Sequence, residues 1–187
     1  MQAEVYAPSI FSGSISPDGK AISALFGGLQ VELSGSDADT VSEIAILRIP
    51  VSITNPTSEV FLGYHVALRG FVEKGSGVRA VVFVELGGAT KVIEFPYGTP
   101  ITGNFEENIF SFVHASVQEP SSEGTQIANT LTPPPHLTAV IVLSMQRHAP
   151  SDSALLGVDS LDVEITGLRN LPKGDEGGEG DDSKDVG

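Results

Sequence analysis

The chain has 187 residues, of which 40% are hydrophobic, and it carries a formal net charge of −14. This length and apolar content suit one domain with a filled hydrophobic core. Binding to nucleic-acid phosphates or to an anionic membrane surface needs many lysines and arginines, and the chain has only ten, so both are excluded. Without a cysteine, the chain can form no disulfide, no thiolate zinc site and no thiol nucleophile.

The first predicted elements are an arm, a turn and two short strands. Residues 1–11 form a partly apolar N-terminal arm that Pro8 interrupts. Residues 16–19 have the sequence Ser-Pro-Asp-Gly, which is a strong turn signal. Residues 21–26 and 29–33 are separated by a Gly-Gly pair, and in the second run Leu29, Val31 and Leu33 alternate with polar residues, so we expect the two runs to form a first hairpin.

The next predicted strand covers residues 44–54. Four of its apolar side chains share one face, and Pro50 falls on the other. Because proline cannot donate to a sheet ladder, Pro50 predicts an edge position or a bulge. The inward side chains of this strand are expected to be Leu47, Ile49, Val51 and Ile53.

Residues 60–86 contain the clearest pattern, two long apolar/polar alternations separated by Gly75-Ser76-Gly77. Two such runs around a glycine-containing turn predict a β-hairpin, with glycines where positive φ is needed. One face of this hairpin is apolar and the other meets water.

Further strands follow down to a tail of different composition. Residues 137–146 are apolar on both parities, which is typical of a central strand covered on two sides. The remaining predicted strands are residues 91–95, 108–116 and 158–166, and a long loop covers 119–136. About nine strands at this spacing predict an all-β, antiparallel β-sandwich or jelly-roll-like fold, with a single domain over residues 12–172. Residues 173–187 are acidic and rich in glycine, so we expect a disordered tail, with weak cation binding as a minor alternative.

The order of segments resembles a family of small secreted proteins of unknown function found in fungi and bacteria. The similar segments are SGSISPDGKAISALF, LQVELSGS, IAILRIPVSITNP, YHVALRGFVEKGSGVRAVVFVELGG and ALLGVDSLDVEI, which lie within residues 12–166. Two cysteines of that family, expected before Gly13 and near Glu43, are absent. The resemblance implies a β-sandwich, export to an extracellular or cell-surface location, and no catalytic residues.

Few residues suggest chemistry. His65, Arg69 and Glu73 share the polar face of one strand, but neighbours four apart on a strand are about 13 Å from each other, so they indicate a solvated face rather than one site. The remaining histidines, His114, His136 and His148, are scattered without metal-ligand spacing.

Other motifs also have structural explanations. Residues 75–80 fit a loose dinucleotide fingerprint, but a strand follows where a helix is required. Residues 37–39 are more typical of an acidic loop than of half a calcium site. Glu106-Glu107 and Asp162/Glu164 could be carboxylate pairs for glycoside hydrolysis, yet the chain has no tryptophan to stack on a sugar. We therefore predict no catalytic, cofactor-binding or metal-binding residue, and no cofactor.

Three function classes remain. The favoured one is a non-enzymatic structural protein that assembles with copies of itself as a homo-oligomer, surface layer or filament, with residues 2–11 adding to a neighbour's sheet edge. The second is a carbohydrate- or protein-binding module that uses loop 119–136. The third is an unrecognised hydrolase.

Overall fold

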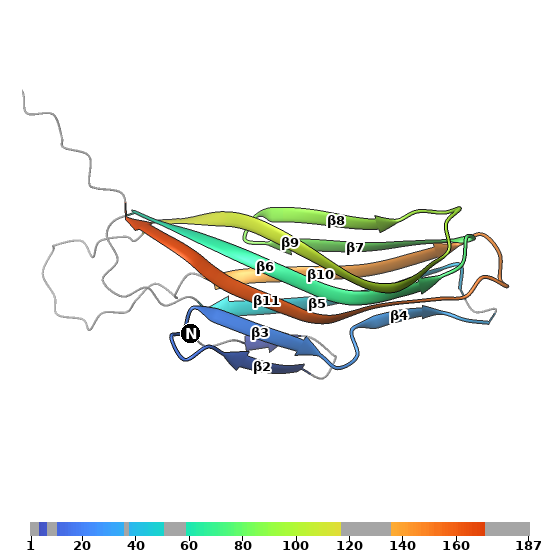
Figure 1. Ribbon diagram of the computed structural model, residues 1–187, viewed down its shortest axis with the longest axis horizontal. Coiled ribbons are helices and arrows are strands. Elements are labelled where there is room, and N and C mark those ends of the chain that lie inside the picture. The colour runs from blue at the N-terminus through green and yellow to red at the C-terminus, as the bar shows by residue number, and fades with distance from the viewer. Residues whose placement is uncertain (1–3, 7–10, 36–37, 51–58, 117–135, 171–187) are drawn as a thin grey trace, which may run out of the picture.

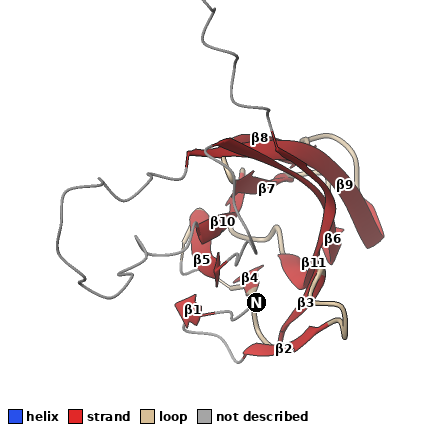
Figure 2. Cartoon of the chain, turned by 90° about the vertical axis from the view of Figure 1, so that its left-hand side faces the viewer, coloured by secondary structure: helices blue, strands red, loops and turns tan. Residues whose placement is uncertain are grey.

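A computed structural model describes residues 4–6, 11–35, 38–50, 59–116 and 136–170 (Figure 1). All regular elements in these ranges are β-strands, and they form two antiparallel sheets that face each other. The predicted all-β sandwich is therefore confirmed. Figure 2 shows one sheet as an arc with the other sheet on its inner side.

The inner sheet, sheet A, has the order β1-β5-β10-β7-β8. Its strands are β1 (Glu4–Tyr6), β5 (Thr40–Pro50), β10 (His136–Arg147), β7 (Val78–Leu86) and β8 (Ala89–Phe95). The outer sheet, sheet B, has the order β2-β3-β11-β6-β9, and β4 pairs with β11 beside β3. Its strands are β2 (Phe11–Ile15), β3 (Ala21–Phe26), β4 (Gln30–Leu33), β6 (Glu59–Lys74), β9 (Ile101–Ser116) and β11 (Ala154–Asn170).

The core lies between the sheets and is filled by alternate residues of each strand. Strand β7 shows the pattern most completely, because every second side chain from Val78 to Leu86 is fully buried. The period-two alternation predicted from the sequence therefore matches the alternation of buried and more exposed side chains in the structure. The largest fully buried side chains are Tyr64, Leu29, Leu33, Leu47, Ile49, Leu68, Leu86, Ile141, Leu143, Met145, Leu156 and Leu161.

The hairpin predicted for residues 60–86 is wrong. Strand β6 pairs with β9 and β11 in sheet B, whereas β7 pairs with β8 and β10 in sheet A, so the turn between them crosses from one sheet to the other. Two strands that face each other across a core have the same period-two pattern as two strands paired side by side, and the sequence alone does not separate the cases. Neither Gly75 nor Gly77 has a positive φ, contrary to expectation. A Cβ at Gly77 would overlap the carboxylate of Asp152.

The hairpin predicted for residues 21–33 is also wrong. Strands β3 and β4 both pair with β11, one after the other along the same edge. Between them the carbonyl of Leu29 accepts a hydrogen bond from the amide of Val158 at 2.9 Å. The Gly27-Gly28 pair is therefore an interruption in one long strand beside β11, at the place where β11 shifts register against β6 between Val158 and Ser160.

The turn predicted at residues 16–19 is confirmed, but it joins β2 to β3. Gly19 has φ of 69°, and its amide donates to the carbonyl of Ser16 at 2.9 Å. The Asp18 carboxylate accepts hydrogen bonds from the Ser16 hydroxyl at 2.6 Å and the Lys20 amide at 3.1 Å. These bonds hold the pKa of Asp18 below its ordinary value, the Ser16 bond most of all.

Strand β5 begins at Thr40, four residues earlier than predicted. Leu47 and Ile49 are buried as expected, while residues 51–58 lie outside the described ranges. Pro50 is the last described residue of β5 and lies two residues beyond Arg48, where the described pairing with β1 ends.

Two later strands also differ from expectation. Strand β9 begins at Ile101, so the loop before it is shorter than the sequence suggested. Strand β10 is central in sheet A, as expected, but only its inner face is covered by another described sheet. Val140 and Val142 on its outer face are half-buried.

Three predicted segments are described only in part or not at all. Residues 4–6 of the arm pair with β5, and Phe11 at its end begins β2, which pairs with β3 of the same chain, so assembly through the arm stays a prediction. Of the loop at 119–136, only His136 is described, as the first residue of β10. The tail at 173–187 lies outside the described residues.

Candidate interaction surfaces

The outer face of sheet B carries a connected polar cluster centred on Arg69. Its Nε lies 3.2 Å from Glu106 Oε2, and its Nη1 lies 2.5 Å from Asp162 Oδ2. Asp162 also accepts a hydrogen bond from the Ser23 hydroxyl. The hydrogen bond with Glu106, followed by that carboxylate's charge, raises the pKa of Arg69.

Strand register explains this cluster. Arg69 in β6 lies directly opposite Glu106 in β9, and Asp162 in β11 lies directly opposite Ser23 in β3. His65, Arg69 and Glu73 lie on one polar face of β6, as expected from the sequence. Their partners come from other strands and depend on a strand register that local periodicity does not contain.

His65 joins the cluster to two exposed aromatic residues. Its Nε2 lies 2.8 Å from Asn108 Oδ1, and its ring stacks on Phe110 with centroids 4.4 Å apart. The side chains of Phe110 and Phe112 are among the most exposed large hydrophobic groups described, with residue exposures of 73% and 66%. The intervening Ser111 points inward with the core-facing parity, so both rings stand on the outer face of β9.

A hollow of about 520 Å³ lies beside the polar cluster. Ala67 forms part of it and is only 6% exposed, although it has the outward parity of β6. Ser14 and Ile15 of the β2–β3 hairpin line one part of the hollow, and Arg69 and Asp162 line another. The site therefore offers both hydrogen-bond donors and acceptors next to apolar surface.

Strand β9 is an edge of sheet B. It pairs with β6 along its whole length, and no described strand pairs with its other side. The ion pair of Lys91 with Glu107, 3.1 Å, and the tilted contact of Phe95 with Phe105 link β8 to the first half of β9. Figure 1 shows that β9 continues beyond β8.

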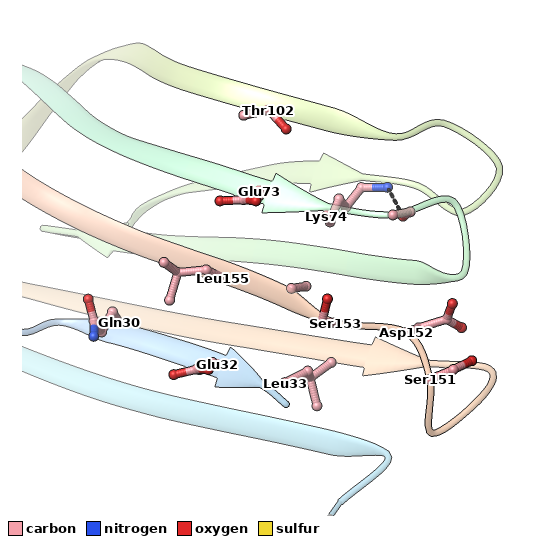
Figure 3. Close-up of a pocket in the computed structure, with 12 residues that line it drawn as sticks. Gln30, Glu32, Leu33, Glu73, Lys74, Thr102, Ser151, Asp152, Ser153 and Leu155 are labelled. Carbon is pink, nitrogen blue, oxygen red and sulfur yellow. Dashed lines mark hydrogen bonds between the residues drawn. The ribbon is translucent and has the colours of Figure 1, made fainter. Parts of the chain in front are cut away.

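A second hollow of about 620 Å³ lies at the loop end of the sandwich (Figure 3). Glu32 and Glu73 flank Leu155 there, each directly opposite it on a neighbouring strand. Lys74 turns its ammonium group toward the neighbouring loop, where it donates to the carbonyls of Pro96 at 2.8 Å and Thr99 at 2.7 Å. Burial lowers the pKa of Lys74, and the side chain acts as a tie between β6 and that loop.

Arg147 ties the other loops at this end. Its side chain is 1% exposed, and its Nη1 donates to the carbonyls of Gly35 at 2.8 Å and Pro150 at 3.1 Å. Asp39 Oδ1 lies 3.6 Å from Nε of Arg147. The two buried cations therefore hold loops in place at this end of the sandwich.

The other carboxylates and histidines singled out in the sequence are separated by the fold. Glu106 pairs with Arg69 on the outer face, whereas Glu107 pairs with Lys91 toward β8, so these two glutamates do not form one acid/base pair. The ring of His148 stacks on Tyr97, with centroids 4.0 Å apart. No group of three or more His, Cys, Asp or Glu side chains that could hold a metal ion occurs within the described ranges.

The outer face of sheet A has an apolar row across four strands. The register places Ile44, Val142, Phe83 and Val92 side by side. Ile44 and Val92, at the two ends of this row, are 54% and 55% exposed. This face differs from β9 because its main-chain groups are paired within sheet A along most of the row.

Neither a family model nor a curated protein matches the sequence, so the resemblance to the secreted fungal and bacterial family stays an expectation. Among solved structures, the chain is similar to TmCBM61 in complex with β-1,4-galactotriose, with 11% identity over 87% of this chain and 88% of that one and a TM-score of 0.31. It is also similar to an exo-β-agarase, with 12% identity over 93% of this chain but only 24% of that one and a TM-score of 0.20. Similarities at these TM-scores support no conclusion about ligand or activity.

No helix in the described part of the chain is long and apolar enough to cross a membrane.

Proposed function

We propose that this protein is a non-enzymatic structural protein that associates with copies of itself through the outer edge of β9. The observation that carries this proposal is the exposure of Phe110 and Phe112, at 73% and 66%, on one edge strand. Fully burying a phenylalanine side chain is worth roughly 1.5–3 kcal/mol relative to leaving it in water. Two such side chains, two residues apart on one face, provide a driving force for a protein contact.

The main chain of β9 supports the same proposal. An edge strand exposes unpaired amide and carbonyl groups, and proteins usually protect such edges with charges or proline. Residues 108–116 contain neither a proline nor an Asp, Glu, Lys or Arg residue. This half of β9 therefore lacks the usual protection against pairing with another strand.

The proposal includes a location outside the cell or at its surface, for which the segment resemblance is the support. It includes no hydrolase activity, because Glu106 and Glu107 make their ion pairs with different partners, Arg69 and Lys91. A hydrolase of the glycosidase type would need two carboxyl groups directed at one bond.

Light scattering coupled to size-exclusion chromatography tests the proposal over a range of protein concentrations. We expect the wild-type chain to show a mass that rises with concentration. The double variant Phe110→Ser/Phe112→Ser should remain monomeric, while the matched control Val92→Ser, which removes an exposed apolar side chain from β8, should associate as the wild type does. A wild-type protein that stays monomeric at every concentration contradicts the proposal.

A second candidate function is binding of a neutral saccharide at the hollow on sheet B. The observation that favours it is the Arg69–Asp162 pair, which offers donors and acceptors with opposite charges in the same hollow as the ring of His65, on which Phe110 stacks. Such a surface suits a hydroxyl-rich ligand without net charge. A glycan array with wild-type protein and an Arg69→Ala variant tests it, and equal signals from both proteins would exclude this site. The part that loop 119–136 would play in such binding lies outside the described residues, apart from His136.

A further inference from the structure

This inference rests on the proposed self-association and specifies its geometry. We propose that β9 pairs antiparallel with β9 of a second copy around a two-fold axis at Ser111. The two B sheets then form one continuous sheet. The partner is a second copy of this chain, because the sequence of β9 is complementary to itself in this register.

The aromatic residues select the register. With the two-fold axis at Ser111, Phe110 lies directly opposite Phe112 of the second copy, and Phe112 lies opposite Phe110. Directly opposite side chains in antiparallel strands have Cβ atoms about 4.5–5.5 Å apart, and aromatic pairs are among the favourable cross-strand contacts. An axis at Phe110 or Phe112 would form only one pair of phenylalanines, on the axis itself.

The charges favour the same register. With the axis at Ser111, Glu106 and Glu107 lie opposite Ser116 and Ala115 of the second copy, so no two carboxylates meet. An axis near residues 106 and 107 would place glutamates opposite each other, and directly opposed like charges destabilise a sheet. An axis at Ile109 would place Glu106 opposite Phe112.

The surroundings of β9 leave room for this contact. Phe105 and Glu107, which contact Phe95 and Lys91 of β8, lie in the first half of β9. The proposed axis lies in the second half, where Figure 1 shows β9 extending past β8. Because a two-fold contact uses the same surface on both copies, it closes as a dimer, and a longer polymer would need a second, different contact.

The absence of cysteine from the chain allows a direct test. In the proposed register, a Ser111→Cys variant places two thiols across the two-fold axis, with Cα atoms within disulfide reach. Under mild oxidation we expect a covalent dimer. The control is Thr102→Cys, at an exposed position on the same strand. Its rate of disulfide cross-linking should be lower by a factor on the order of ten or more, because association does not bring its thiols together.

The hydroxyl of Ser111 bonds to Tyr64, so replacing Ser111 could disturb the fold locally. A second pair of variants therefore tests the same register without changing Ser111. Phe110→Cys and Phe112→Cys should form a disulfide when mixed. Each alone should cross-link poorly, because its two copies are diagonal neighbours about 7–8 Å apart. If the wild-type protein associates but neither experiment gives the expected cross-links, the register is wrong while self-association stands. If the wild-type protein is monomeric, both proposals fail.

Discussion

The phenol of Tyr64 in β6 donates a hydrogen bond of 2.5 Å to the main-chain carbonyl of Leu86 in β7. Tyr64 is 0% exposed, and the bond joins sheet B to sheet A inside the core. Burial raises the pKa of Tyr64, and this effect exceeds the opposing effect of its hydrogen bond with Ser111. One polar contact therefore fixes how two strands that are consecutive in sequence face each other.

We expect Tyr64→Phe to lower the free energy of unfolding by about 1–2 kcal/mol, because the substitution removes a buried hydrogen bond while keeping the ring. Urea unfolding at neutral pH measures the change. Tyr97→Phe is the matched control, since Tyr97 stacks on His148 near the surface, and it should change the stability by less than about 0.5 kcal/mol. Equal stability of wild type and Tyr64→Phe would show that the bond contributes nothing.

The raised pKa of Tyr64 predicts a loss of stability at alkaline pH. Its folded-state pKa lies above the ordinary value of 10.0, so above that pH the unfolded chain loses the phenol proton while the folded chain keeps it. The unfolded state then binds fewer protons, and stability falls as the pH rises from 10.0 through the folded-state value. Unfolding midpoints measured across this range should fall less steeply for Tyr64→Phe than for wild type.

Two strand glycines should respond in opposite ways to an added methyl group. A Cβ at Gly70 in β6 would overlap the carbonyl oxygen of Gly157 in β11 and the ring of Phe105. A Cβ at Gly103 in β9 would meet nothing within 4 Å. We expect Gly70→Ala to cost about 2–4 kcal/mol, since main chain would have to move, and Gly103→Ala to be neutral or slightly stabilising. Thermal unfolding of the two variants gives the comparison, and a similar melting temperature for both would contradict the packing of β6 on β11.

A second comparison of two glycine substitutions uses the turn between β7 and β8. Gly87 and Gly88 have φ of 53° and 87°, which is the two-residue turn that matches the twist of paired strands. Gly88→Ala should therefore cost about 1 kcal/mol. Gly28→Ala should have little effect, because Gly28 has neither a positive φ nor an atom within 4 Å of its would-be Cβ. Denaturant midpoints distinguish the two variants, and a destabilised Gly28→Ala would contradict this account.

These turns show what the sequence could and could not predict. Period-two alternation identified which side chains of β7 are buried, because burial depends only on the face of the strand. It did not identify the sheet to which β6 and β7 belong, since Gly75-Ser76-Gly77 connects opposite sheets while Gly87-Gly88 connects neighbours. An adjacent glycine pair does not separate the cases either, because Gly27-Gly28 lies between two strands that both pair with β11.

The candidate surfaces were less predictable than the fold. Arg69 was placed on a polar face correctly, but its partners Glu106 and Asp162 are 37 and 93 residues away and meet it only through strand register. Phe110 and Phe112 share one parity of β9. Hydrophobicity alone does not tell which parity of β9 faces the core, because both parities contain apolar side chains. In the structure Ile109 is buried, whereas Phe110 and Phe112, on the opposite parity, are exposed.

Self-association through β9 should strengthen with ionic strength. Each copy carries a net charge of −14, so two copies repel each other, and salt screens this repulsion over a Debye length of about 10 Å at 0.1 M. The contact itself consists of apolar side chains and main-chain hydrogen bonds, which screening weakens little. Sedimentation velocity at low salt and at about 0.3 M salt should therefore show a larger associated fraction at the higher salt. A Phe110→Ser/Phe112→Ser variant should show no such increase. Association that weakens with salt would instead indicate a contact between opposite charges, and that result would contradict pairing through the uncharged half of β9.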